Sequence, residues 1–192
     1  MLEQLAALDK AIFLFINMSL ANPVTDFFMP VITSDQVLRV IYGLAIALIL
    51  WRGDARLRWL ALFSALTLVL TDQLSAGLMK PFFARPRPCH VLVDIHLLVG
   101  CGGGFSMPSS HAANSLGQAF LFSLTIPRLK YHLYVIAGII AISRVFVGVH
   151  YPGDVLVGAM VGAVCGWLMA VLFDQFEKRF LEEKAPSVSE GS

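Results

Sequence analysis

Long apolar stretches, separated by charged residues or by proline and glycine, constrain this chain more than any other feature of its sequence. The longest lie at 58–79, 109–126, 131–149 and 154–173. A transmembrane helix needs about 20 mostly apolar residues, so each stretch is of a length suited to crossing a bilayer. The composition agrees, because 57% of the residues are hydrophobic and only 14% are charged, against about 25% charged in soluble proteins. The sequence therefore predicts an integral membrane protein.

Three further segments complete the predicted plan. Residues 36–51 form another apolar stretch, residues 24–33 a shorter one, and residues 5–21 an amphipathic stretch that ends at an Asn-Pro pair. The amphipathic stretch is compatible with a crossing or with a position in the membrane interface. We predict an all-α polytopic bundle of about six transmembrane helices, forming one domain over residues 1–176. Residues 177–192 are expected to be a charged, disordered cytoplasmic tail.

Basic residues gather on one side of this predicted bundle. Short loops rich in Lys and Arg remain in the cytoplasm. If the last four stretches alternate across the membrane, eight of the 14 basic residues share one side: Arg52, Arg56, Arg58, Arg128, Lys130, Lys178, Arg179 and Lys184. The C-terminus is then cytoplasmic, and Lys80, residues 81–108 and His150 lie outside. The net charge of +1 gives no reason to expect a nucleic-acid partner.

Several smaller features have mainly structural interpretations. Cys89 and Cys101 flank the outer loop, where both a disulfide and two free thiols remain open. His90, Asp94 and His96 lie near them, but no fourth ligand is evident, so we expect no metal site. Glycines recur at four-residue spacing at positions 158, 162 and 166, which indicates close packing of two helices.

The first of three polar clusters is KPFFARPRP at residues 80–88. Long basic side chains near a membrane ordinarily extend to the lipid headgroups, but that explanation predicts a cytoplasmic location, and this cluster is predicted outside. Guanidinium and ammonium groups bind phosphate oxygens well. We therefore predict that Lys80 and Arg87 bind a phosphate, and assign Arg85 to the surface.

The second cluster, FSMPSSHAAN at residues 105–114, begins a predicted helix. Proline and serine here are an ordinary helix-start signal. The free N–H groups of a helix N-terminus also bind anions, and Ser109 and Ser110 add hydroxyl donors. His111 in the first turn is therefore either a structural histidine or a general acid beside a bound phosphate.

The third cluster is SRVFVGVHYPGD at residues 143–154. Arg144 lies in an apolar helix, where an unpaired guanidinium costs roughly 3 kcal/mol on insertion scales, so it needs an anion. His150 and Asp154 are four residues apart, and the carboxylate can bind one imidazole nitrogen and leave the other deprotonated as a nucleophile. The pair is equally compatible with a structural contact at a helix turn.

These clusters contain Lys-x6-Arg-Pro, Pro-Ser-x-His and Ser-Arg-x5-His-x3-Asp, in that order, between residues 80 and 154. With this combination the chain resembles the membrane branch of the type 2 phosphatidic acid phosphatase family. The resemblance implies a six-helix fold and hydrolysis of a lipid phosphate through a phosphohistidine, with no metal or other cofactor. The sequence agrees, because it offers no carboxylate cluster able to hold magnesium.

The resemblance also implies the roles of individual residues. His150 is the nucleophile, Asp154 orients it, and His111 protonates the leaving oxygen and later assists water. Five residues are implied to hold the substrate phosphate: Lys80, Arg87, Ser109, Ser110 and Arg144. The family's commonest second motif has glycine where this chain has Ser110, and serine lacks the backbone freedom of glycine. Serine at this position resembles the variant found among polyprenyl-diphosphate phosphatases.

The substrate expected first is undecaprenyl diphosphate, in the inner (plasma) membrane of a bacterium, with the site facing the periplasm or exterior. Phosphatidylglycerophosphate, phosphatidic acid and the 1-phosphate of lipid A remain alternatives. A lipid-phosphate binder or transporter without chemistry is a different class of hypothesis. Such a protein needs the cations but has no use for the His150–Asp154 pair, so the sequence favours an enzyme. The sequence gives no prediction of the oligomeric state.

Overall fold

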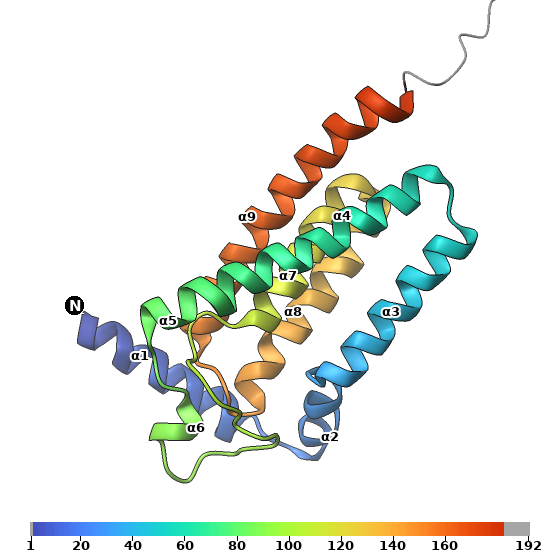
Figure 1. Cartoon of the computed structure of the whole chain (residues 1–192). Coiled ribbons are helices and arrows are strands. Elements are labelled where there is room, and N and C mark those ends of the chain that lie inside the picture. Colours follow the sequence, from blue (N-terminus) through green and yellow to red (C-terminus); the bar gives the residue numbers. More distant parts are fainter. Residues whose placement is uncertain (1, 183–192) are drawn as a thin grey trace, which may run out of the picture.

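The computed structural model describes residues 2–182, and every regular element in this part of the chain is a helix (Figure 1). The predicted all-α class is thereby confirmed. The longer helices are α1 (Leu2–Leu14), α2 (Pro23–Ile32), α3 (Asp35–Arg52), α4 (Ala55–Asp72), α7 (Ser110–Thr125), α8 (Lys130–Phe146) and α9 (Pro152–Glu177). The shorter elements are η1 (Phe15–Ser19), η2 (Gln73–Met79), α5 (Lys80–Phe83), α6 (Pro88–Val91), η3 (Pro127–Leu129) and η4 (Lys178–Glu182).

Three helical segments of the described chain are long and apolar enough to cross a membrane: Ala55–Val91, Pro127–Phe146 and Pro152–Leu181. A fourth is present if the bent pair Glu3–Ser19 and Pro23–Ile32, with an angle of 114° between its halves, counts as one span. The chain is therefore a helical membrane protein. Helix α7 has only 16 residues, so length alone does not identify it as a crossing, and the predicted total of about six stays a prediction.

The chain between α1 and α3 turns because of local capping. Asn22 precedes α2, and its side chain accepts hydrogen bonds from the backbone N–H groups of Val24 and Thr25. Pro23 occupies the first turn, where its missing N–H costs nothing. The Ser34 side chain caps α3 in the same way. The two caps fix α2 as a short separate helix in place of a continuation of α1.

Because proline disfavours helix in the residue before it, the sequence predicts that the helix of residues 58–79 stops at Lys80-Pro81. This prediction is wrong. The chain stays helical through the π-helical segment η2 and α5, and stops at Ala84, whose φ of 45° is left-handed. The π-helical register ends the regular hydrogen-bond ladder before Pro81. The proline then falls in the first turn of α5, where it is tolerated.

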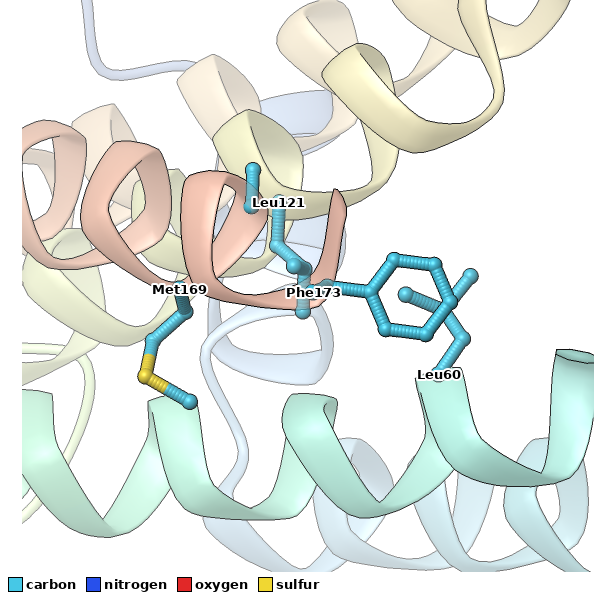
Figure 2. Packing of buried hydrophobic residues seen from close by; sticks show 5 residues of the cluster. Leu60, Leu121, Met169 and Phe173 are labelled. Carbon is cyan, nitrogen blue, oxygen red and sulfur yellow. The ribbon is translucent and has the colours of Figure 1, made fainter. Parts of the chain in front are cut away.

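Helix α7 is the centre of the bundle and lies against α4, α8 and α9 (Figure 1). The predicted close packing at the spaced glycines is confirmed, because a Cβ at position 158, 162 or 166 of α9 would collide with a carbonyl oxygen of α7 or of the residue just before it. Figure 2 shows the apolar cluster farther along the same helices, where Leu60 of α4, Leu121 of α7 and Phe173 of α9 are buried together. This packing holds the start of α7 against the start of α9.

The segment between α5 and α7 forms a cross-linked loop. Cys89 and Cys101 form a disulfide, which decides the question that the sequence left open. The thiolates that a metal would need beside His90 are therefore consumed. His96 Nε2 lies 2.9 Å from a carboxylate oxygen of Asp26 in α2, which ties the loop to the N-terminal helices.

The C-terminal helix extends beyond its predicted end. Helix α9 runs to Glu177 and continues as η4 to Glu182, so the first six residues of the predicted tail are helical. The rest of that predicted disordered tail, residues 183–192, lies outside the described residues. The elements α1, α2, α5 and α6 gather at one end of the bundle, and the C-terminal end of α9 lies at the opposite end (Figure 1).

Candidate active site

The three polar clusters of the sequence meet at the end of the bundle that carries α5 and α6. Lys80 begins α5, Arg87 precedes α6, and Arg144 lies in the last turn of α8. These three cations are within electrostatic reach of one another. His150, in the connection between α8 and α9, is within reach of both arginines. A set of like charges held this close requires an anion.

Several donors in this cluster are buried and have no partner in the described part of the chain. They are Nε of Arg87, Nε of Arg144 and the hydroxyl of Ser109. A buried donor that lacks a hydrogen bond costs about 1–3 kcal/mol. An anion with several acceptor oxygens, such as a phosphate, would bind all three donors. The cluster therefore has the donors and the charge suited to binding an oxyanion.

The start of α7 contributes to this site. Ser109 is the N-cap of α7, and its backbone N–H donates to the carbonyl oxygen of Asp154 at 2.9 Å. The hydroxyl of Ser110 lies 3.3 Å from that of Ser75 in η2. Among the described residues other than glycine, only Ala84 and Asp94 have positive φ. The backbone at Ser110 therefore does not need the freedom of the glycine that the commonest motif has there.

His150 and Asp154 lie beside each other, but a third side chain joins them. His150 Nδ1 is 3.6 Å from Asp154 Oδ2, which is too long for a good hydrogen bond. The Ser106 hydroxyl donates to Asp154 Oδ2 and lies 3.3 Å from His150 Nδ1. The backbone N–H of Tyr151 donates to the same carboxylate oxygen at 2.8 Å. The Ser106 hydroxyl thus bridges His150 and Asp154, where the sequence predicted a direct hydrogen bond between them.

Burial decides the charge of His150. Only 2% of this residue is exposed. Burial lowers the pKa of His150 to about 4 against the opposing effect of Asp154, and the positive charges of Arg144 and Arg87 lower it further. The imidazole is therefore neutral at neutral pH. Because Nδ1 faces Ser106, Nε2 is the nitrogen left to act as a nucleophile.

His111 is held by a residue from the N-terminal half. Its Nε2 lies 3.0 Å from the carbonyl oxygen of Thr33 and 3.4 Å from Oδ1 of Asp35. The hydroxyl of the same Thr33 accepts a 2.6 Å hydrogen bond from Arg144. Thr33 therefore links the two groups at the junction of α2 and α3. No sequence signal distinguished this threonine within its apolar segment.

The assignment of Arg85 to the surface is wrong. Its guanidinium donates to Oδ1 of Asp154 at 2.8 Å and to Oδ2 of Asp9 at 2.7 Å. It also lies over the ring of Tyr151, 4.1 Å from the ring centroid. A carboxylate buried as fully as Asp154 needs a cation. The sequence indicates that a buried Asp154 would need a cation, but it does not show that α1 supplies Asp9 as a second carboxylate for Arg85.

A groove with a cavity volume of about 610 Å³ leads away from His111 between α3, α4, α7 and α8. Near His111 its wall carries polar side chains, among them Arg39, Asp72 and Asn114. The deeper wall is apolar and includes Phe122 and Leu133. One end of the Asn114 amide is bound to the hydroxyl of Thr71 at 2.6 Å. The groove thus has the polarity of a lipid, with a polar end at the site and an apolar end inside the bundle.

Several known proteins resemble this chain in sequence and fold. The sequence model of the PAP2 superfamily matches residues 59–178. The chain is similar to the lipid A 4'-phosphatase of Bacteroides thetaiotaomicron, with 30% identity over 200 residues that cover 100% of this chain and 88% of that protein. It is also similar to the undecaprenyl-diphosphatase BcrC of Bacillus subtilis, with 27% identity over 77% of this chain and 74% of that protein.

Among solved structures, the chain is similar to the crystal structure of Aquifex aeolicus LpxE. The TM-score is 0.70, the identity is 30%, and the match covers 84% of this chain and 94% of that one. The matched fold therefore extends beyond the three motifs to nearly the whole bundle. The N-terminal helices before residue 59 lie outside the match to the superfamily model.

Proposed function

The chain belongs to the PAP2 superfamily and is a membrane lipid phosphatase, and we propose that it works through a phosphohistidine on His150. The observation that carries the proposal is the set of buried, unpaired donors on Arg87, Ser109 and Arg144 beside a neutral imidazole. Such donors stabilise the charge that develops on phosphate oxygens in the transition state. Lys80 and the start of α7 with Ser110 complete the cradle.

In the first half of the reaction, Nε2 of His150 attacks the phosphorus atom while the bond from phosphorus to the lipid oxygen breaks. Asp154, through Ser106, stabilises the positive imidazole that forms. His111 donates a proton to the leaving oxygen, so the lipid departs as an alcohol, or as a monophosphate if the substrate is a diphosphate. His111 must be protonated for this step.

In the second half, water attacks the phosphohistidine. His111, now neutral, accepts a proton from the water, and the nitrogen–phosphorus bond breaks. Inorganic phosphate leaves and His150 returns to its neutral form. All proton transfers in this cycle use groups that the chain supplies, and we expect turnover without a divalent cation.

The best-supported substrate is a phosphate on an acylated sugar such as lipid A. The polar wall of the groove runs along α7 from His111 to Gln118, which is about 10 Å at 1.5 Å per residue. A sugar with amide- or ester-linked chains has polar groups over such a depth. The likeness to a lipid A 4'-phosphatase over the whole chain supports the same substrate class.

Undecaprenyl diphosphate, expected first from the sequence, is the second candidate. The likeness to BcrC and the serine at position 110 favour it. Its prenyl chain is hydrocarbon directly beyond the diphosphate, so it would offer no polar group to the polar wall of the groove. For this reason the acylated sugar ranks above it.

The site faces outward from a bacterial inner (plasma) membrane, and the C-terminus is cytoplasmic. Of the eight basic residues expected to be cytoplasmic, the seven that the structure describes lie at the opposite side and support this orientation. The disulfide of the outer loop supports it too, because disulfides persist in oxidising compartments. Helices α3, α4, α7, α8 and α9 give five crossings. The bent pair α1–α2 is the sixth segment, and both of its halves lie near the site end.

Phosphate release by the purified protein in detergent tests the proposal. Lipid A, undecaprenyl diphosphate, phosphatidylglycerophosphate and phosphatidic acid are compared in excess chelator, with His150→Ala as the inactive control. We expect lipid A to have the highest kcat/KM and the chelator to have no effect. Higher kcat/KM for the diphosphate would reverse the substrate ranking, and loss of activity that magnesium restores would contradict the metal-independent mechanism.

A further inference from the structure

We propose that Asp9 of α1, acting through Arg85, is a positioning residue for the nucleophile His150 and its partner Asp154. This positioning role rests on the proposed function in one respect only, which is that His150 is the nucleophile. Asp9 lies before residue 59, outside the part of the chain that matches the superfamily model. Its role would make the N-terminal helix part of the catalytic apparatus, beyond any function as a membrane segment.

One face of the N-terminal helix contacts the connection that carries His150. Asp9, Phe13 and Asn17 follow one another at four-residue spacing along α1 and η1, so their side chains lie on the same face. Phe13 and Asn17 are completely buried. These three side chains form the face of the N-terminal helix that contacts this connection.

Asn17 and Phe13 hold the chain on both sides of His150. The amide nitrogen of Asn17 donates to the carbonyl oxygens of His96 and Phe146, each at 2.8 Å, and its amide oxygen accepts from the His96 N–H at 2.9 Å. The ring of Phe13 packs edge-on against Tyr151 with 5.4 Å between centroids. The helix thus fixes the residues before and after the nucleophile.

Asp9 makes the polar contacts of this face. Its Oδ1 accepts the backbone N–H of Gly153 at 2.7 Å, and its Oδ2 accepts from Arg85 at 2.7 Å. A Cβ at position 153 would lie 2.9 Å from Oδ2 of Asp9. The close approach of the carboxylate therefore depends on glycine at this position.

Arg85 carries the effect of Asp9 to the reacting pair. Asp154 is completely buried, and Arg85 forms its only ion pair with a Lys or Arg among the described residues. Oδ1 of Asp154 binds Arg85, which leaves Oδ2 for Ser106 and the His150 side. The orientation of the carboxylate, and through it that of the imidazole, therefore depends on where the guanidinium is held.

Asp9 keeps Arg85 away from the phosphate cradle. Arg85 is two residues from Arg87, so an unrestrained guanidinium would be attracted to a bound phosphate. With carboxylates on both of its ends and Tyr151 under its plane, it is fixed on Asp154. Without Asp9 it would move toward the anion and leave Asp154 without its cation.

The test uses Asp9→Asn, which keeps an acceptor for Gly153 but removes the charge that holds Arg85. We expect kcat for lipid A in mixed micelles to fall about tenfold, less than the roughly hundredfold loss that a misplacement of about 1 Å can cause, with KM within about twofold of wild type. Glu3→Gln is the matched control. It removes the same charge from an exposed site on the same helix, and it should keep the wild-type kcat.

A double-mutant cycle separates positioning from general structural support. If Asp9 acts through Arg85, the double variant should have a kcat less than about twofold below that of Arg85→Ala alone. If the kcat losses of the two single variants multiply in the double variant, Asp9 does not act through Arg85. Thermal unfolding of each variant in detergent shows whether a lower rate merely follows loss of folded protein.

Binding of orthovanadate distinguishes a failure of this inference from a failure of the proposed substrate. Vanadate can accept an imidazole nitrogen as a ligand and then resembles a phosphate under attack. Weaker vanadate binding by folded Asp9→Asn than by Glu3→Gln supports the positioning role even if wild type releases no phosphate from lipid A. Wild-type kcat and vanadate affinity in Asp9→Asn would overturn it, even if lipid A is hydrolysed.

Discussion

The two site histidines differ in how the fold holds them. His150 is 2% exposed and is surrounded by Ser106, Asp154 and the Arg85–Asp9 pair, with α1 packed against the connection on both sides. The His111 side chain is 14% exposed, lines the groove, and is held mainly by Thr33 and Asp35 at the junction of α2 and α3. The difference suits the two proposed roles, because a nucleophile must be neutral and fixed, whereas an acid must reach a leaving group that differs between lipids.

The largest expected effect concerns the nucleophile. His150→Ala should lower kcat by at least about 10³-fold for every lipid substrate, because no neighbouring group can replace Nε2 in forming the covalent intermediate. Phosphate release in detergent measures this loss. Lipid binding should persist, since the cradle cations remain. Substantial turnover by the folded variant would show that the two histidines have been assigned the wrong roles.

Removal of the acid should have an effect that depends on the leaving group. His111→Ala should lower kcat for a lipid phosphate by about 10²–10⁴-fold, the range of general acid catalysis. The loss should be much smaller for p-nitrophenyl phosphate, because its leaving group needs no proton. Equal losses with both substrates would contradict the role of His111 and would indicate that it binds phosphate instead.

The hydroxyl bridge provides a smaller and more selective test. Ser106→Ala should lower kcat by roughly tenfold, since the imidazole loses a contact that orients it. Ser106→Thr keeps a hydroxyl and should recover much of the activity. If the alanine variant matches wild type, the carboxylate must act on His150 directly, despite the 3.6 Å separation.

The smallest expected effect is that of mild acid on His150. Its pKa is lowered to about 4, whereas a free imidazole has a pKa of about 6.5. Between pH 7 and pH 5.5, His150 should therefore remain neutral, and it should gain a proton only near pH 4. An NMR titration of labelled histidine, assigned with the His150→Ala variant, measures the midpoint directly. A midpoint near 6.5 would contradict the buried, neutral nucleophile.

The sequence predicted the helical class and the convergence of the three clusters, because both follow from local patterns. Apolar length identifies helices, and polar residues such as Lys80 and Arg144 are costly near lipid unless they serve a site. The four-residue spacing of His150 and Asp154 also placed them together. These features depend only on residues that are close in the sequence or share a predicted helix end.

The remaining features depend on contacts between distant segments. Arg85 was assigned to the surface because nothing in its own cluster shows that Asp9, 76 residues earlier, reaches it. Thr33 contacts His111 across 78 residues. The polar wall of the groove arises only when α3 and α7 face the same groove. A single sequence contains no signal for such pairings, so the support of each histidine could not be predicted.

Chemical trapping of the intermediate is the most direct test of the central claim. Wild-type protein is mixed with lipid A labelled with ³²P at its phosphates, quenched in alkali within one turnover, and digested for mass spectrometry. The account predicts alkali-stable, acid-labile phosphate on the peptide that contains His150, and none in His150→Ala. Label on another residue, or phosphate release with no label on His150 at any time within that turnover, would contradict it.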